Sequence, residues 1–279
     1  MKERSRPKAL QFRGGGITAL FLFVHLFSYV AFSPAVLAAD KEKFTIAYAS
    51  EWSPYSYGLG ADVQGILPRL MDSIFAGIED YEVVHSGLPW ERAQQVFFGG
   101  LVDGMVTTAT QKRLKYSRPS REAALEIPFH PIIRVDSEFE EDILRDPELK
   151  VLKDLRYCDV LGNGWAEEFY SNRGIEYSIA PTIDHCLLQL SLNRVDVVVH
   201  AKPVLEIFKT RLGLGEQLKI VDLKYEESPQ FPLLVSNSFE RAPDLIEKFD
   251  REIAQLKSNG AYDDLMSAFV AAEKSGKPD

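Results

Sequence analysis

The sequence contains the same order of elements twice, and this recurrence constrains the fold more than any other feature. In each copy, a helical pattern leads through a short turn into a Val-Asp pair and a short apolar strand with polar residues at its end. The two copies read L-V-D-G-M-V-T-T at 101–108 and R-V-D-V-V-V-H-A-K at 194–202. A helix that leads into a buried strand is the building unit of α/β sheets. We therefore expect a repeated α/β arrangement, as one large domain or as two lobes.

The stretch from Trp90 to Arg113 carries the first copy and ends in a candidate anion site. A helix is expected to stop at Gly99-Gly100, and a buried strand is expected over 102–108. The apolar positions on one face of this helix are Ala93, Val96, Phe97 and Leu101. Ligands of open α/β sheets bind at the carboxyl ends of strands, where Thr108 and Arg113 follow this strand. Hydroxyl, amide and guanidinium groups there favour an anion, and an ordinary surface arginine is the alternative.

Residues 1–38 have the three parts of a secretory signal peptide. Basic residues precede an apolar run over 17–32, and the small residues Val36 and Ala38 fit cleavage after Ala38 or Ala39. An uncleaved anchor is the alternative, but the run is shorter than the ~20 residues that span a bilayer. No cysteine lies directly after the run or at the expected cleavage site, so a lipoprotein anchor is not supported. We therefore expect export to the periplasm.

The charge of the chain limits its partners. The formal net charge is −9, and the basic signal peptide makes this total less negative than that of the exported part. Nucleic acids and anionic membranes are bound by concentrated basic faces, and no Lys/Arg run follows the signal peptide. The sequence also lacks a P-loop, a dinucleotide fingerprint and a His/Cys cluster with metal-ligand spacing. We expect no nucleic-acid partner, no cofactor and no metal.

The sequence has two cysteines, Cys158 and Cys186. An oxidising compartment permits a disulfide between them. However, Cys158 is expected near the start of a strand and Cys186 in the first turns of a helix, toward opposite ends of a parallel α/β unit. Two buried thiols are therefore the favoured interpretation, with the disulfide as the alternative.

Three further segments place polar or aromatic groups beside strand ends. An aromatic loop with a proline, 50–58, follows the strand expected at 44–49. A glycine-rich turn at 162–165 presents free amides, which suit an anion. The second copy ends in His200 and Lys202, for which a capped core histidine and a solvated lysine are the alternatives. The candidate ligand-binding residues are Trp52, Tyr55, Trp90, Thr108, Arg113, Gly164, Trp165, His200 and Lys202.

Prolines interrupt the pattern at 128–131 and again at 229–232. Proline excludes a long helix and suits an extended segment, so we expect one crossing out of the first lobe and one crossing back. The predicted division is a signal peptide (1–38), the first part of lobe 1 (41–132), lobe 2 (133–230) and a return to lobe 1 with C-terminal helices (231–279).

Taken together, these motifs resemble the periplasmic solute-binding proteins of the amino-acid-type ABC transporter family (family 3), which have the type II periplasmic binding fold. The motifs that carry the resemblance are, in chain order, W-S-P-Y-S-Y with Gly65, P-W-x-R through D-G-M to T-x-x-R, G-N-G-W, R-V-D-V-V-V-H, and P-D-L-I with L-K-S-N-G-A-Y. The resemblance covers nearly the whole exported chain. It implies an α/β fold of two lobes, joined by two crossing segments, that close on a ligand like a Venus flytrap. It also implies a monomer that delivers a small molecule to an ABC permease or a membrane sensor.

The resemblance implies that Arg113 holds a ligand carboxylate with the hydroxyl of Thr108 beside it. It also implies that the aromatic rings of Trp90 and Tyr55 form walls of the ligand site. The turn at Gly164 and Trp165 in the second lobe would meet the same carboxylate, and His200 would lie at the end of the strand that closes over it. The family typically places an aspartate for the ligand's ammonium group where this chain has Ala201. Because a buried ammonium without a carboxylate is costly, we expect a solute without this amine, with a second anionic group near Lys202.

These features predict a non-catalytic protein that binds a small polar, carboxylate-bearing solute by lobe closure. The alternative is an exported enzyme on the same fold, a dehydratase or lyase, with His200 or Glu51 as general base. The sequence has no Ser-His-Asp arrangement, no carboxylate pair and no metal spacing that would support this alternative. A sensory protein without a permease is a third interpretation, which the sequence does not separate from the first.

Overall fold

Two five-stranded sheets organise the protein in a computed structural model that describes residues 41–146, 149–150, 152–223 and 229–275. The first sheet has the order β4 (Tyr81–Leu88), β1 (Glu42–Ala49), β5 (Gly104–Val106), β12 (Gln230–Ser236) and β6 (Ser117–Glu126). Strand β1 runs parallel to β4 and β5, whereas β12 runs antiparallel to β5 and β6. A ribbon of β2 (Glu51–Trp52) and β3 (Ser56–Tyr57) follows β1. The signal peptide predicted at 1–38 lies outside the described residues.

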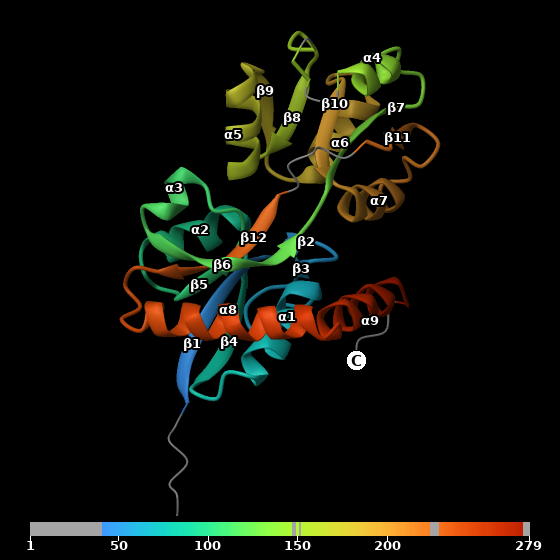
Figure 1. Ribbon diagram of the computed structural model, residues 1–279. Coiled ribbons are helices and arrows are strands. Elements are labelled where there is room, and N and C mark those ends of the chain that lie inside the picture. The colour runs from blue at the N-terminus through green and yellow to red at the C-terminus, as the bar shows by residue number, and fades with distance from the viewer. Residues whose placement is uncertain (1–40, 147–148, 151, 224–228, 276–279) are drawn as a thin grey trace, which may run out of the picture. The chain divides into compact units, whose positions relative to one another are not determined.

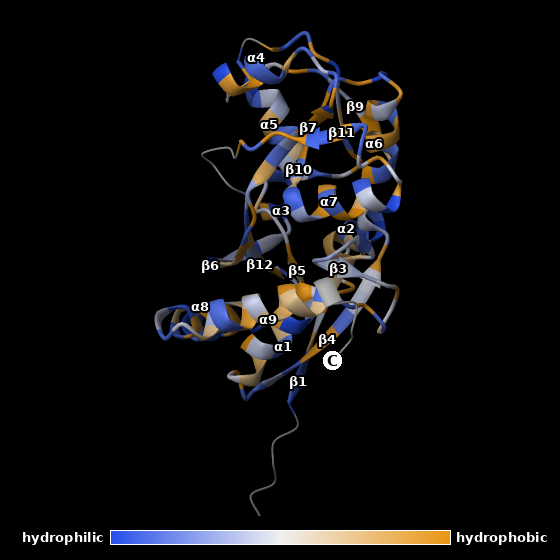
Figure 2. Ribbon diagram, turned by 90° about the vertical axis from the view of Figure 1, so that its right-hand side faces the viewer, coloured by the Kyte–Doolittle hydropathy of each residue, from blue (hydrophilic) through white to orange (hydrophobic). Residues whose placement is uncertain are grey.

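Helices cover both faces of the first sheet (Figure 1). Side chains alternate along a strand, so Phe44, Ile46 and Tyr48 of β1 belong to one buried cluster and Ala47 to another. The first cluster includes residues of α1 (Ile66–Ala76), α8 (Ala242–Ser258) and α9 (Ala261–Ser275). The second includes residues of α2 (Trp90–Phe98). Figure 2 shows hydrophobic and hydrophilic residues along α8, as expected for a helix with one buried face.

The second sheet has the order β11 (Leu218–Ile220), β7 (Phe129–Arg134), β10 (Val197–Ala201), β8 (Tyr157–Val160) and β9 (Tyr177–Ala180). Strand β8 runs parallel to β9 and β10, whereas β7 runs antiparallel to β10 and β11. The helices in this part of the chain are α4 (Glu140–Arg145), α5 (Gly164–Arg173), α6 (Ile183–Ser191) and α7 (Lys202–Arg211). Among the helices of the described residues, none has both the length and the apolar character that a membrane span requires.

Two crossing segments join the sheets, as predicted. Strand β6 continues through residues 127–128 into β7 of the second sheet, and after β11 of the second sheet the next strand, β12, belongs again to the first sheet (Figure 1). The α/β architecture of two lobes is therefore confirmed, and each lobe is defined here by one sheet and its helices. Because all of Phe129–Arg134 belongs to the second sheet, the first crossing lies before Phe129, whereas the sequence-based division extends lobe 1 to residue 132.

The region around the first copy of the repeat differs in detail from the prediction. Helix α2 ends before Gly99, as predicted, but Leu101 is 73 % exposed because the helix no longer directs its side chain toward the sheet. A short helix, α3 (Gln111–Leu114), follows β5 and was not predicted. The hydroxyl of Thr110 accepts a hydrogen bond from the backbone N–H of Arg113 at 3.4 Å and so caps this helix. Arg113 is therefore fixed in a helical turn instead of a loop.

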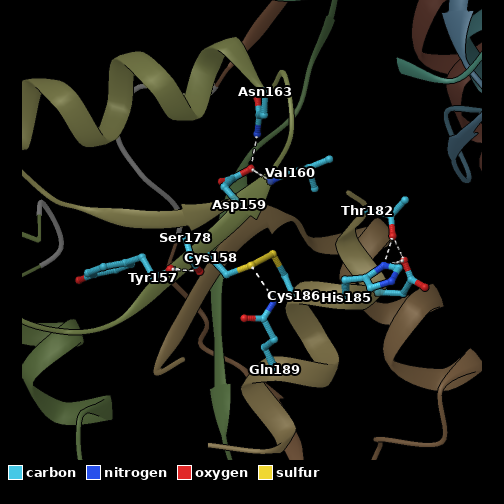
Figure 3. The surroundings of a disulfide bond; sticks show 11 residues. Tyr157, Cys158, Asp159, Val160, Asn163, Ser178, Thr182, His185, Cys186 and Gln189 are labelled. Atoms are coloured by element: carbon cyan, nitrogen blue, oxygen red, sulfur yellow. Dashed lines mark hydrogen bonds and ion pairs between the residues drawn. A yellow bond between two sulfur atoms is a disulfide. The ribbon is translucent and has the colours of Figure 1, made fainter. Parts of the chain in front are cut away.

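Cys158 and Cys186 form a disulfide, so the expectation of two buried thiols was wrong (Figure 3). That expectation placed the two residues toward opposite ends of the sheet. Strand β8 has four residues and rises only about 13 Å, so its two ends are not far apart. Cys186 lies in the first turn of α6, and the two Cα atoms are 5.6 Å apart. The bond ties α6 to β8, next to the strand end where the 162–165 turn begins.

Candidate functional site

A cavity of about 340 Å³ lies between the two lobes. Its walls include residues at the carboxyl ends of β1, β4 and β5 in lobe 1 and of β8, β9 and β10 in lobe 2. Ligands of open α/β sheets bind at such ends. The volume is near the lower limit for small-molecule sites in proteins, so the cavity suits a small solute.

Arg113 lines this cavity with its guanidinium engaged by neutral acceptors. Its Nε and Nη2 donate to Oε1 of Gln94 at 3.3 and 3.0 Å. Its Nη1 donates to the carbonyl oxygen and the hydroxyl of Thr108 at 3.0 and 2.6 Å. Its Nη2 also donates to the carbonyl oxygen of Gly162 at 3.3 Å. The guanidinium therefore connects α2 and the end of β5 in lobe 1 with the 162–165 turn of lobe 2.

The positive charge of Arg113 is buried, and no carboxylate of the described residues forms an ion pair with it. Burial lowers the pKa of Arg113 to about 10, and the more distant carboxylates of Glu167, Glu168 and Glu91 oppose this shift. The side chain therefore stays charged at neutral pH. A buried charge that only neutral groups contact favours an anion, because pairing offsets the loss of hydration.

Glycines in the 162–165 turn let lobe 2 approach Arg113 closely. The carbonyl oxygen of Gly162 also accepts from Nε1 of Trp90 at 2.8 Å. The φ of Gly162 is 74°, and a Cβ there would lie 2.1 Å from Oε1 of Glu91. At Gly164, a Cβ would lie 3.2 Å from Cζ of Arg113. The contact between the lobes thus depends on the absence of side chains at both positions.

The polar side chains that line the cavity from lobe 2 include His200, Asn163 and Thr182. His200 is 6 % exposed, its ring stacks on Phe129 at 5.2 Å, and its Nδ1 has no hydrogen-bond partner in the described part of the chain. Burial lowers the pKa of His200 to about 4, so the imidazole is neutral at pH 7. The Nδ2 of Asn163 donates to Oδ1 of Asp159 at 2.8 Å (Figure 3). The carboxyl of Asp159 is fully buried, and burial raises its pKa to about 7.

The structure brings most of the predicted site residues together at the cavity. Those that line it are Trp52, Trp90, Thr108, Arg113, Trp165 and His200. Three others lie outside the lining. The ring of Tyr55 contacts that of Trp52 in a tilted arrangement, with 4.7 Å between ring centroids, and Gly164 packs against the guanidinium of Arg113. Lys202 begins α7 and pairs with Asp222 at 3.8 Å.

Sequence reasoning missed several residues that shape the cavity. Gln94 is buried on the otherwise apolar face of α2, one turn after Trp90, and a polar residue at such a position was the available signal. Phe129 and Phe231 line the cavity directly after the two crossings. Their proximity to prolines gave a weak signal, but the directions of their rings depend on the folded sheets. The sequence pointed to Asn163 only as a member of the glycine-rich turn, and gave no indication that its side-chain amide would line the cavity.

The two sheets, the two crossings and the cavity at the strand ends define the fold as the two-lobed fold of periplasmic binding proteins, of type II. Other proteins with this fold include solute-binding proteins and the ligand-binding parts of sensors.

Solved structures similar to this chain support that assignment. One comes from a study of glutathione import in Gram-positive bacteria through GshT and the cystine importer TcyBC of Streptococcus mutans; its TM-score is 0.65 and its identity 17%, covering 83% of this chain and 95% of that one. A histidine kinase sensor domain has a TM-score of 0.65 and 16% identity, over 82% and 96% of the chains. The binding protein AbpA of Streptococcus pneumoniae, bound to L-arginine, has a TM-score of 0.62 and 18% identity, over 83% and 95%.

At these identities the shared property is the fold. No protein-family model and no curated protein matches the chain.

Proposed function

We propose that this chain is an exported solute-binding protein that holds a small carboxylate between its lobes. The buried guanidinium of Arg113 carries the proposal. It lines the cavity, it is 2 % exposed, and its hydrogen bonds reach the neutral groups of Gln94, Thr108 and Gly162. A solute carboxylate would give this cation an anionic partner. Its hydrogen bonds to the guanidinium would be stronger than those that the neutral acceptors now make.

The contact at Gly162 gives a route by which a solute would link the two lobes. Nη2 of Arg113 reaches the Gly162 carbonyl at 3.3 Å, the longest distance in this group together with that from Nε to Gln94. A carboxylate oxygen would compete well for this N–H. The same solute would contact Trp165 and His200 of lobe 2, so binding would favour the closed arrangement of the lobes. No covalent step is needed for this mechanism.

The nature of the lining supports a solute without an α-ammonium group. Ala201 is fully buried, so the position where the similar family has an aspartate offers no charge here. The carboxylates that do line the cavity, those of Glu51 and Glu91, lie at exposed and half-buried positions. An ammonium group held deep in the cavity would therefore have no buried carboxylate to pair with. Lys202 lies outside the lining, so a second anionic group gains no support from it.

Export is supported by two features of the chain. Residues 1–38 have the sequence pattern of a signal peptide, and the described part contains a disulfide between Cys158 and Cys186. Disulfides persist in oxidising compartments such as the periplasm. After export, the loaded protein would deliver its solute to an ABC permease or present it to a membrane sensor.

Binding is favoured over catalysis by the chemistry of the cavity. The imidazole of His200 has a pKa lowered by burial to about 4, which makes it a weak base. Glu51, the other base considered from the sequence, is exposed. Among the similar solved structures described above are a substrate-binding protein and a sensor domain.

The proposal is tested by thermal unfolding of the purified exported part with a panel of small carboxylates and L-amino acids. Arg113→Lys keeps the charge but loses the planar fork, and Arg118→Ala, at an exposed position of β6 outside the lining, is the control. At a carboxylate concentration of about 100 Kd, the wild type should gain about 2.7 kcal/mol of stability. Arg118→Ala should keep this gain and Arg113→Lys should lose most of it.

Two results would contradict the proposal: no carboxylate in the panel stabilises the wild type, or the stabilisation is the same in Arg113→Lys. A clear shift with an L-amino acid would overturn the inference about the missing ammonium site and leave carboxylate binding intact. Arg113→Ala is less suitable, because it would leave buried acceptors of Gln94, Thr108 and Gly162 without their donor and reduce stability by itself.

A further inference from the structure

Aromatic rings from both lobes line the cavity. In lobe 1, the rings of Trp52 and Phe231 lie 5.3 Å apart at an angle of 33°. In lobe 2, Phe129 lies between two rings: His200 is parallel to it at 5.2 Å, and Trp165 meets it edge-on at 4.5 Å. All of these residues line the cavity. A solute held between the lobes would therefore contact one aromatic wall from each lobe.

The polar groups of the buried lining are few, and most are already engaged. The hydroxyl of Tyr48 is hydrogen-bonded to Nδ1 of His85 at 2.9 Å, and that of Ser56 donates to the carbonyl oxygen of Ala49 at 2.7 Å. The imidazole of His200 is neutral at pH 7 and has a buried Nδ1 without a partner in the described residues. A sugar-like solute needs many free polar partners, and few polar groups of the buried part of the lining are free to serve as such.

The charges of the lining also select among aromatic solutes. Arg113 lies over the ring of Trp90 at 5.2 Å, so the cation–π position on this ring is already occupied by the protein's own cation. A second cation brought beside it would be repelled at short range in a poorly hydrated site. A solute with an uncharged ring and one carboxylate brings no second cation, so it neither competes for the ring of Trp90 nor is repelled by Arg113.

We propose, on the basis of the solute binding proposed above, that the ligand is a small aromatic monocarboxylate. Its carboxylate pairs with Arg113, and its ring lies between the wall of Trp52 and Phe231 and the wall of Phe129 and Trp165. Rings at offset or edge-on distances of about 4.5 to 7 Å attract one another beyond the effect of buried area alone. The ring edge lies toward His200, where a hydroxyl or ring nitrogen finds a neutral hydrogen-bonding group.

Three related probes separate the features of this proposal. Phenylacetate has the ring and the carboxylate, cyclohexylacetate replaces the ring with a saturated one of similar size, and phenylglycine adds the α-ammonium group. Calorimetric titration of the exported protein should show the tightest binding for phenylacetate. Loss of ring-to-ring attraction should weaken cyclohexylacetate by about tenfold, and phenylglycine should bind more weakly still.

The tryptophans provide an independent readout, because the sequence has three and all of them, Trp52, Trp90 and Trp165, line the cavity. Phenylacetate should therefore change the intrinsic tryptophan emission with the same Kd as in calorimetry. Trp165→Leu should weaken phenylacetate by about tenfold while reducing the affinity for cyclohexylacetate less. Tyr116→Leu is the control, since this exposed ring contacts Phe98 at 4.7 Å in a tilted arrangement and lies outside the lining.

The possible outcomes separate failure of the proposed ligand class from failure of the proposed function. Equal affinity for phenylacetate and cyclohexylacetate would overturn the aromatic class, and so would binding of aliphatic but not aromatic carboxylates; both leave solute binding at Arg113 intact. If no carboxylate of any kind binds, the proposed function fails together with this inference. Should Trp165→Leu fail to fold, the comparison of phenylacetate with cyclohexylacetate on the unmodified protein still decides the question.

Discussion

The buried carboxyl of Asp159 should make the stability of this protein decrease as the pH rises through neutrality. Its Oδ1 accepts hydrogen bonds from the backbone N–H of Val160 at 2.7 Å and from Asn163 at 2.8 Å, while Oδ2 is buried with no partner in the described residues. Burial raises the pKa of Asp159 from 3.8 to about 7, and the two hydrogen bonds oppose this shift. The protonated form is therefore the one that the folded protein favours.

The sign and the size of the effect follow from the two pKa values. A group whose pKa is higher in the folded state binds its proton more tightly there than in the unfolded chain. The resulting stabilisation is fully present below the unfolded pKa of 3.8 and is lost as the pH rises through the folded pKa of about 7. Between about pH 5 and about pH 8, the free energy of unfolding should fall by about 2.5 kcal/mol from this group alone.

Urea unfolding of the wild type and of Asp159→Asn at these two pH values measures the effect. Asparagine does not titrate, so the difference between the two proteins removes the contributions of other groups. The wild type should lose about 2.5 kcal/mol more than the variant as the pH is raised. Asp196→Asn is the control: hydrogen bonds from Arg156 hold the pKa of Asp196 below its usual value of 3.8, so this carboxylate is ionised at both pH values and its removal should leave the pH dependence between them unchanged. Parallel pH dependences of wild type and Asp159→Asn would refute the reasoning.

Two further substitutions test structural features described above. Gly162→Ala should cost about 1 to 2 kcal/mol for its positive φ and more for the contact with Glu91, whereas Gly213→Ala, with a φ of 67° and open space around it, should show the backbone cost alone. Equal losses of stability for Gly162→Ala and Gly213→Ala in urea would mean that lobe 1 does not make a close contact with Gly162. Replacing Cys158 and Cys186 with serine should lower the unfolding free energy by about 3 to 4 kcal/mol, given their sequence separation of 28. A reducing agent should reproduce this loss in the wild type, and insensitivity to it would count against the bond.

Local patterns in the sequence were sufficient to predict the elements that form the two lobes. The apolar face of α2 and its end before Gly99 follow from residue spacing and from glycine, because both act within a few residues of the chain. The polar ends of β5 and β10 led to Thr108, Arg113 and His200 for the same reason. The position of each of these residues depends on the direction of a single strand. That direction can be inferred from the alternation of side chains along the strand and from its length.

What the sequence did not reveal depends on contacts between distant segments. The hydrogen bonds from Trp90 and Arg113 to the carbonyl of Gly162 join residues of different lobes, and no local pattern encodes such a distance. The side chain of Lys202 lies outside the lining because the chain turns from β10 into α7 at this residue. The disulfide was misjudged because the short length of β8 decides how close its two ends are to α6.

The crossings have a consequence for how such a protein changes its specificity. Phe129 begins β7 and Phe231 is the second residue of β12, so each crossing is directly followed by a ring of the cavity wall. Under the proposed lobe closure, a substitution in residues 127–128 would alter the opening of the lobes and the shape of the cavity together. Mutational adjustment of ligand preference, whether in evolution or in the construction of a biosensor, is therefore less constrained at Trp90 and Trp165, which are held by helices α2 and α5.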